Sequence, residues 1–518
     1  MAEKTGRIAR NAVWVSLDNI AALVLGMVGS VLVARAMGPT ILGYYNYVIF
    51  VTSLAMAVID TGIPGTAVKF GSELLHGGHQ GQARTVLRLA FRLQIALGVL
   101  LTLIGVGLVY IVVPVEHRDY SVLAALTLLP GLMLGGQTSY FSASQNFGWP
   151  ALSSFCANVI GFSIIMATLY FHWGLVGLVS TILVSRIFDV GFRGLLMAKI
   201  HSELREPGHD PLPAELRQRI WRFGSLSMVM FVINILVWSR SETFFLKYFC
   251  AIEQVALYTL SFSMLEKVWI LPNLFAYTVG VHAMGDYGRD RATLQANMRS
   301  MFRYLSLAAL PMLVGLAAVA PSFVRGFYGP RYEGAIAPMV IQALLTIPRL
   351  FAYPTLYLLN ISERQDILVK WGVSCAALSV VLDLFFIPGY AAIGAAWANG
   401  LTQVIASAAL MYISLLLFPL RLPLKVLTRI ALSAALMGIV AWAISAILPP
   451  LPGLAAGIAS GGAVYILLLR TFRALEPEDR NRLLSLQTQL PGRVRSFYGR
   501  FVYWVIPETS PATTAPGI

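Results

Sequence analysis

The stretch IALGVLLTLIGVGLVYIVV, residues 95–113, contains no charged side chain. At a rise of about 1.5 Å per residue it can cross a hydrocarbon core of about 30 Å as a single helix. Similar runs recur along all 518 residues, of which 57% are hydrophobic and 12% charged. A soluble domain would carry about 25% charged residues. The sequence therefore predicts an all-α polytopic membrane protein.

About fourteen such runs can be distinguished, each close to the length of a membrane-spanning helix. A β-barrel would instead show short segments of alternating polarity, which the sequence lacks. The predicted spans are 12–35, 42–63, 85–113, 121–143, 151–170, 173–197, 219–240, 251–280, 296–320, 332–359, 365–387, 391–417, 426–448 and 451–470.

Basic residues are unevenly distributed between the connections. If the N-terminus is cytoplasmic, most Lys and Arg residues lie on the inner side, and the outer connections hold Arg35, Arg118, Arg240, Lys247, Arg325 and Arg331. This positive-inside asymmetry predicts that both termini are cytoplasmic. It also accounts for most of the net charge of +14 without a nucleic-acid partner. The N-terminal apolar run is too long for a cleaved signal peptide and is expected to remain as the first helix.

Three pairs of segments are similar at nearly the same spacing. GPTILGYYNYVIFVTSL (38–54) aligns with AIEQVALYTLSFSMLEK (251–267), an offset of 213 residues. Arg92 aligns with Arg303 at 211 and Gly177 with Gly394 at 217. An internal repeat of this kind predicts two six-helix lobes of the same orientation.

The repeat divides the chain into five parts. Residues 1–200 form the predicted N-lobe, and 201–218, rich in proline and charge, form a cytoplasmic linker. Residues 219–417 form the C-lobe, and 418–470 add helices 13 and 14 outside the repeat. Residues 471–518 form a cytoplasmic tail, with an amphipathic surface helix followed by a disordered end.

Two motifs resemble a known family. RAMGPTILGYYNY (35–47) and DTGIPGTAVKF (60–70) are similar to the turn and the following segment of the polysaccharide exporters, including Wzx-type flippases. These form one branch of the multidrug/oligosaccharidyl-lipid/polysaccharide (MOP) superfamily. Leu42 and Lys69 depart from the usual aromatic residue and arginine. The resemblance implies alternating access and outward movement of an undecaprenyl-diphosphate-linked oligosaccharide in a prokaryotic inner membrane.

Charged side chains at membrane depth are the candidate site residues, because each costs about 2.5–3.5 kcal/mol to insert. Glu266 and Lys267 lie in the apolar stretch FSMLEKVWILPN (262–273), where Glu266 shares a helix face with Asn273. They are expected to line the substrate cavity or to form an ion pair with another helix. Arg349, between two prolines, marks a broken helix and is expected to line the cavity or to pair with Asp383.

Three further charges remain open to two readings, and two more form one candidate pair. Asp18 is a candidate for proton or sodium coupling, or a partner for a cation near the inner interface. Asp60 is a gating candidate that more readily fits a turn-fixing role. Arg240 is a cavity candidate or a headgroup contact. Arg186 and Asp189 have the i, i+3 spacing of an intrahelical ion pair.

The predicted function is a flippase for an anionic lipid-linked glycan in surface polysaccharide biosynthesis, since cations suit a diphosphate. The alternative is a cation-coupled multidrug exporter with the same architecture. A membrane glycosyltransferase or polymerase is disfavoured, because no long outer loop or catalytic motif is present. We expect no catalytic residues, cofactor or metal site. The expected partners are the lipid-linked substrate, the bilayer, a coupling ion (H⁺ or Na⁺) and polysaccharide polymerase machinery.

Overall fold

A computed structural model describes residues 2–60, 62–203, 211–225, 241–286, 291–362, 364–418, 422–475 and 492–506, with single positions between 419 and 484. Within these ranges the secondary structure is helical and no strand occurs. Nine helices in the described part are long and apolar enough to cross a membrane, or ten if a bent pair counts as one span. The predicted span 219–240 lies mostly outside the described residues, as do the side chains from 274 to 280 in the span 251–280. The count of fourteen therefore remains a prediction.

The outer surfaces of the helices are apolar. Ile111 and Ile447 are each 81% exposed, and Leu195 and Phe385 are each 74% exposed. Large apolar side chains that project in such numbers from a folded chain require an apolar surrounding medium. The chain is therefore a multi-pass membrane protein.

The chain divides into two compact units, Met1–Thr259 (unit 1) and Leu260–Ile518 (unit 2). The predicted lobe boundary at 201–218 stays a prediction. Unit 1 contains α1 (Ala2–Asp60), α2 (Gly62–His76), α3 (Gln80–Val112), η1 (Val115–His117), α4 (Arg118–Leu126), α5 (Leu128–Ala143), α6 (Gly148–Tyr170), α7 (Gly174–Glu203), α9 (Glu242–Phe249) and the first turns of α10 (Ile252–Asp286).

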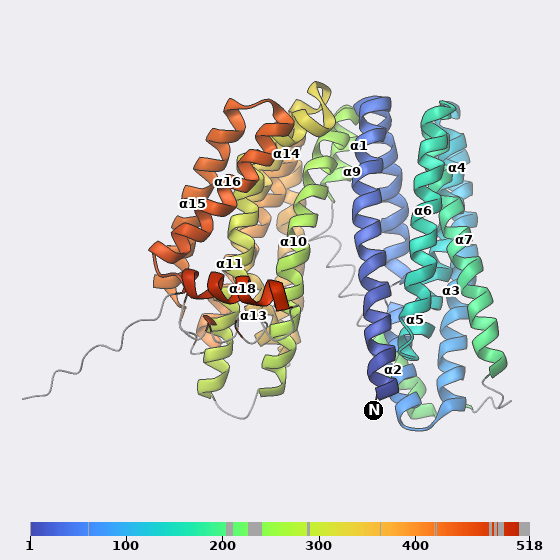
Figure 1. Cartoon of the computed structure of the whole chain (residues 1–518). Helices are drawn as coiled ribbons and strands as arrows, with labels where there is room; N and C mark the ends of the chain where they lie inside the picture. Colours follow the sequence, from blue (N-terminus) through green and yellow to red (C-terminus); the bar gives the residue numbers. More distant parts are fainter. Residues whose placement is uncertain are drawn as a thin grey trace, which may run out of the picture. The chain divides into compact units, whose positions relative to one another are not determined.

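Unit 2 contains the rest of α10, and its core lies between α10, α11, α15 and α16 (Figure 1). Leu265, Met301 and Ile430 belong to this core, so the two helices outside the repeat pack directly on it. The elements are α11 (Arg291–Phe323), η2 (Val324–Tyr328), η3 (Pro330–Ala335), α12 (Ile336–Leu345), α13 (Arg349–Ile361), α14 (Gln365–Leu417), α15 (Leu424–Ile447), α16 (Pro450–Thr471) and α18 (Gly492–Val505).

Two of the long helices contain a break. α1 breaks at Gly38, with φ 79°, and α14 breaks at Ala391, with φ 49°. The breaks separate the predicted spans 12–35 from 42–63 and 365–387 from 391–417. Each long helix thus corresponds to two consecutive spans of the sequence prediction.

The structure reproduces the repeat at its third pair of segments. Gly174 and Ala391, 217 residues apart, both have positive φ and precede the aligned glycines by three residues. A Cβ atom on Gly177 would lie 2.5 Å from Thr168 Cγ2, and one on Gly394 would lie 2.2 Å from Phe386 O. In both repeats the glycine therefore allows a helix start to lie against the end of the preceding helix.

The first pair of segments makes direct contact inside unit 1. Thr40 Oγ1 donates to Glu253 Oε1 at 2.7 Å, and Asn46 Nδ2 donates to Thr259 Oγ1 at 2.7 Å, each across 213 residues. These spacings equal the repeat offset, so repeat-equivalent positions face one another. A Cβ atom on Gly43 would lie 2.3 Å from Ile252 O, so the glycine of the LGYY motif permits this close approach.

The chain after α16 is anchored to unit 2. Arg303 of α11 is buried, and its Nη2 lies 2.5 Å from Asp479 Oδ1. The Tyr304 hydroxyl donates to the same oxygen. The repeat-equivalent Arg92 is exposed instead.

Beyond this anchor, α18 lies crosswise to α15 and α16 (Figure 1). The Arg470 guanidinium carbon lies 4.5 Å from the centre of the Trp504 ring, which connects the end of α16 to α18. Most of the amphipathic helix predicted from RALEPEDRNRLLSLQTQL (473–490) lies outside the described residues.

Candidate functional site

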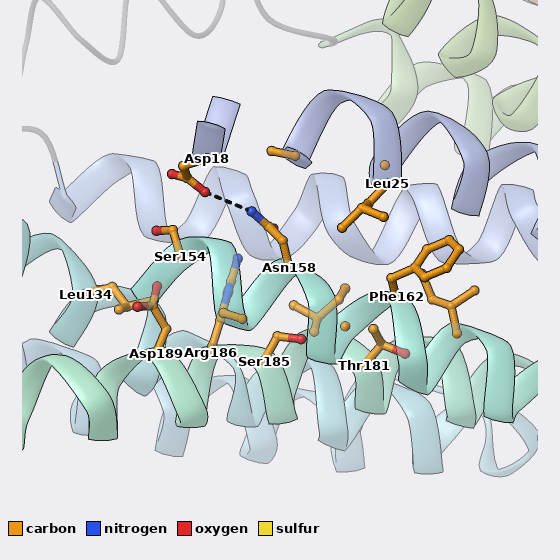
Figure 2. Close-up of a pocket in the computed structure, with 16 residues that line it drawn as sticks. Asp18, Leu25, Leu134, Ser154, Asn158, Phe162, Thr181, Ser185, Arg186 and Asp189 are labelled. Atoms are coloured by element: carbon orange, nitrogen blue, oxygen red, sulfur yellow. Dashed lines mark hydrogen bonds between the residues drawn. The ribbon is translucent and has the colours of Figure 1, made fainter. Parts of the chain in front are cut away.

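A polar cavity of about 390 Å³ lies between α1, α6 and α7 in unit 1 (Figure 2). Asp18, Ala22 and Leu25 line it from one face of α1. Asn158 of α6 donates from Nδ2 to Asp18 Oδ1 at 3.2 Å. The carboxylate of Asp18 therefore faces an internal space and is held by an amide. Its coupling role stays a prediction.

A buried network closes one side of this cavity. Arg193 Nε lies 2.7 Å from Asp189 Oδ1, and the Ser153 hydroxyl donates to the same carboxylate. Arg193 also donates to Ser154 Oγ at 2.7 Å and to Thr138 Oγ1 at 2.8 Å. Both members of the ion pair are thus held by several hydrogen bonds, as buried charges require.

This network corrects the sequence prediction for Asp189. The ion pair of Asp189 forms at the i, i+4 spacing with Arg193 rather than at i, i+3 with Arg186. Arg186 Nη1 donates to Thr127 O at 3.1 Å and lines the cavity next to Asp189 (Figure 2). Sequence reasoning did not single out Arg193, Ser154 or Asn158. The i, i+4 spacing of Ser154 and Asn158 on an apolar helix was the available signal.

In unit 2, Arg349 lies against an aromatic pair. Its guanidinium carbon is 5.2 Å from the ring centre of Trp269 on α10 and 5.4 Å from that of Tyr353 on α13. Arg349 is the first residue of α13, and the helices on either side of residues 346–348 are bent by 46°. The broken helix predicted at this position is therefore confirmed.

The other candidates of unit 2 lie on α10 close to Trp269. Glu266 and Asn273 are exposed, and Lys267 is half-buried. The structure therefore brings Arg349 to the same stretch of α10. Asp383, the other proposed partner of Arg349, is buried in α14.

Two candidates cannot be placed. Arg240 and the side chain of Asp60 lie outside the described residues. Among the described residues, no cluster of three or more His, Cys, Asp or Glu has metal-binding geometry.

The helical architecture, the internal repeat and the polar groups at membrane depth define a transporter-like membrane protein. Residues 8–282 match the family described as "Polysaccharide biosynthesis protein". The chain belongs to this family, which confirms the resemblance seen in the sequence.

Known proteins agree with this assignment. The chain is 22% identical over 507 residues to the teichuronic acid biosynthesis protein TuaB of Bacillus subtilis (strain 168), covering 93% of this chain and 98% of that protein.

Two solved structures share the fold. The lipid II flippase MurJ in an inward closed conformation matches with a TM-score of 0.70 at 14% identity, covering 89% of this chain and 98% of MurJ. An inward-facing multidrug resistance MATE family transporter of the MOP superfamily matches with a TM-score of 0.63 at 12% identity, covering 78% and 97%.

Proposed function

We propose that the chain is a flippase that moves an undecaprenyl-diphosphate-linked oligosaccharide across the cytoplasmic membrane by alternating access. In this proposal both termini are cytoplasmic, and the chain acts as a transporter rather than an enzyme. Membership of the polysaccharide biosynthesis family supports it, as do the names of TuaB and of the lipid II flippase MurJ. Polysaccharide polymerase machinery is a proposed partner.

The observation that carries the proposal is the placement of Arg349 beside α10. A diphosphate cannot enter a membrane protein at low cost without cations or hydrogen-bond donors. Arginine binds phosphate with two parallel N–H donors, and aromatic rings can orient its guanidinium plane. Arg349 is placed against two such rings, because Trp269 and Tyr353 contact it at the start of α13.

Lys267 supplies a second positive charge on the neighbouring stretch of α10. Glu266 is the proposed counter-ion of Lys267 in the absence of substrate, and the phosphate would replace it when substrate binds. Asn273, two helical turns further on, is a candidate donor to the sugar. Arg240 is assigned to the outward-open state.

The test is the sidedness of radiolabelled lipid-diphosphate oligosaccharide in cells that lack the chain. We expect the lipid to accumulate on the cytoplasmic leaflet and the wild type to relieve this accumulation. Lys267→Ala and Arg349→Gln should fail to do so at normal protein levels. Arg331→Gln, an exposed arginine of unit 2, is the matched control and should restore transport. Normal export with Lys267→Ala would exclude the proposed role of this residue.

A second candidate function is supported by the cavity of unit 1. In that cavity Asp18 can carry a proton, and Asp18, Asn158 and Ser154 offer oxygen atoms to a sodium ion. A cation-coupled multidrug exporter would need such a site. Unchanged glycan sidedness, together with new sensitivity to cationic dyes in cells that lack the chain, would favour this alternative.

A further inference from the structure

A second cavity, of about 470 Å³, lies in unit 1 between α2 and the helical residues 214–225. Three of its lining residues are the basic residues Lys69, Arg219 and Arg222. Two are aromatic, Phe70 and Phe223, whose rings meet edge to face at 5.8 Å. The function proposed above does not use this cavity.

The aromatic pair holds the cations in position without neutralising them. Lys69 Nζ lies 3.7 Å from the ring centre of Phe223 and 5.5 Å from that of Phe70. The Arg219 guanidinium carbon lies 5.3 Å from the Phe70 ring. A cation over an aromatic face keeps its full charge and its outward N–H donors. The two rings therefore orient Lys69 and leave its outward N–H donors available.

Carboxylates offset this charge only in part. Arg219 Nη1 lies 3.0 Å from Glu73 Oε1, with the two side chains 59% and 48% exposed. An ion pair this open to solvent is weak, so Arg219 can exchange Glu73 for another anion. Glu215 also lines the cavity. Among the described residues, Lys69 and Arg222 make no ion pair with a carboxylate.

The cavity rests on a rigid base. Phe70, Leu74, Ala83 and Val86 of α2 and α3 form a buried cluster, and Leu212, Leu216, Ile220 and Phe223 pack against it. The cationic side chains are therefore carried by two packed helices rather than by a loop. In Figure 1, α2 lies at the same end of unit 1 as the start of α1. In the proposed orientation that end faces the cytoplasm.

We propose that this cavity binds the phosphate of a lipid headgroup in the cytoplasmic leaflet. Arg219 and Arg222 would contact phosphate oxygens through paired N–H donors, and Lys69 would act as a point charge. Gln218 offers an additional amide. Two lipids carry this chemistry: an anionic phospholipid of the leaflet and the lipid-linked diphosphate. Only the second source rests on the proposed function.

The test is native mass spectrometry of the purified full chain in detergent. Undecaprenyl diphosphate, phosphatidylglycerol and the uncharged undecaprenol are added in separate titrations. Lys69→Met keeps the apolar stem of the side chain, and Arg222→Gln keeps a polar side chain. Each should weaken binding of a phosphate-bearing lipid about fivefold, the contribution of one cation near an anionic lipid surface. Undecaprenol binding should not change.

Arg217→Gln is the matched control, because Arg217 is exposed on the same helical segment and does not line the cavity. Weakened binding of both phosphate-bearing lipids would assign the site to any lipid phosphate of the leaflet. Weakened binding of phosphatidylglycerol alone would assign it to leaflet phospholipid, and weakened binding of undecaprenyl diphosphate alone would assign it to the substrate. Unchanged binding in both variants, or an equal loss with Arg217→Gln, would overturn the proposal. If Lys69→Met weakens phosphatidylglycerol binding, the lipid site is supported even when glycan sidedness does not depend on the chain.

Discussion

Replacing Ala391 by glycine should stabilise the protein. Ala391 has φ 49° and ψ −126° at the break in α14, a conformation in which an L side chain is strained. Such a residue costs about 1–3 kcal/mol. Glycine removes this cost but loses about 0.5–1 kcal/mol more backbone entropy on folding. The net gain in the free energy of unfolding is therefore about 1 kcal/mol.

The repeat supplies the opposite substitution as a control. Gly174 occupies the equivalent position with φ 60°, and a Cβ atom there would meet nothing within 4 Å. Gly174→Ala therefore changes only the backbone term, and the left-handed conformation costs about 1–2 kcal/mol for alanine.

Both variants can be compared by thermal unfolding of the purified chain in detergent, followed by tryptophan fluorescence. We expect Tm to rise for Ala391→Gly and to fall for Gly174→Ala, each by less than about 4 °C. A lower Tm for Ala391→Gly would refute the assignment of strain to this break.

Three further substitutions test other parts of the structure. Asp479→Ala should lower the free energy of unfolding by about 3–5 kcal/mol, because it leaves a buried arginine charge without its carboxylate, and thermal unfolding measures the loss. Gly43→Ala should lower the free energy of unfolding by about 1–3 kcal/mol, because the new Cβ atom would overlap the carbonyl oxygen of Ile252. Gly26→Ala is the control, since a Cβ atom there meets open space and should cause no loss. An equal Tm for the two variants would contradict the close approach of Gly43 to Ile252. Asp18→Asn should abolish the dependence of glycan export on the proton or sodium gradient. Export is measured in vesicles under each imposed gradient. Export by the variant that still follows the gradient would exclude Asp18 as the coupling residue.

The sequence was sufficient to predict the fold class, because a membrane-spanning helix is specified by local composition. The break at Arg349 was also predictable, since flanking prolines act on the adjacent backbone. The partner of Asp189 was not, because i, i+3 and i, i+4 positions lie on the same helix face and tertiary neighbours choose between them. Ser153 on α6 contributes to that choice by donating to the carboxylate.

The pair between Arg303 and Asp479 was beyond sequence reasoning for a different reason. The two residues are 176 positions apart, and no local pattern marks either as a buried partner. The alignment of Arg92 with Arg303 gives no sign of this difference. The difference between them arises from the tail, which lies outside the repeat and covers Arg303.

The contacts between repeat-equivalent positions on α1 and α10 bear on how such a chain could evolve. If the two repeats descend from one duplicated gene, their common ancestor met a second copy of itself through the same segment. In that homodimer each residue on the symmetry axis faced an identical residue, so two glutamates at this level would have repelled each other. Fusion into one chain removes this constraint. Thr40 can donate to Glu253, and Asn46 to Thr259, because each side of the contact now mutates independently.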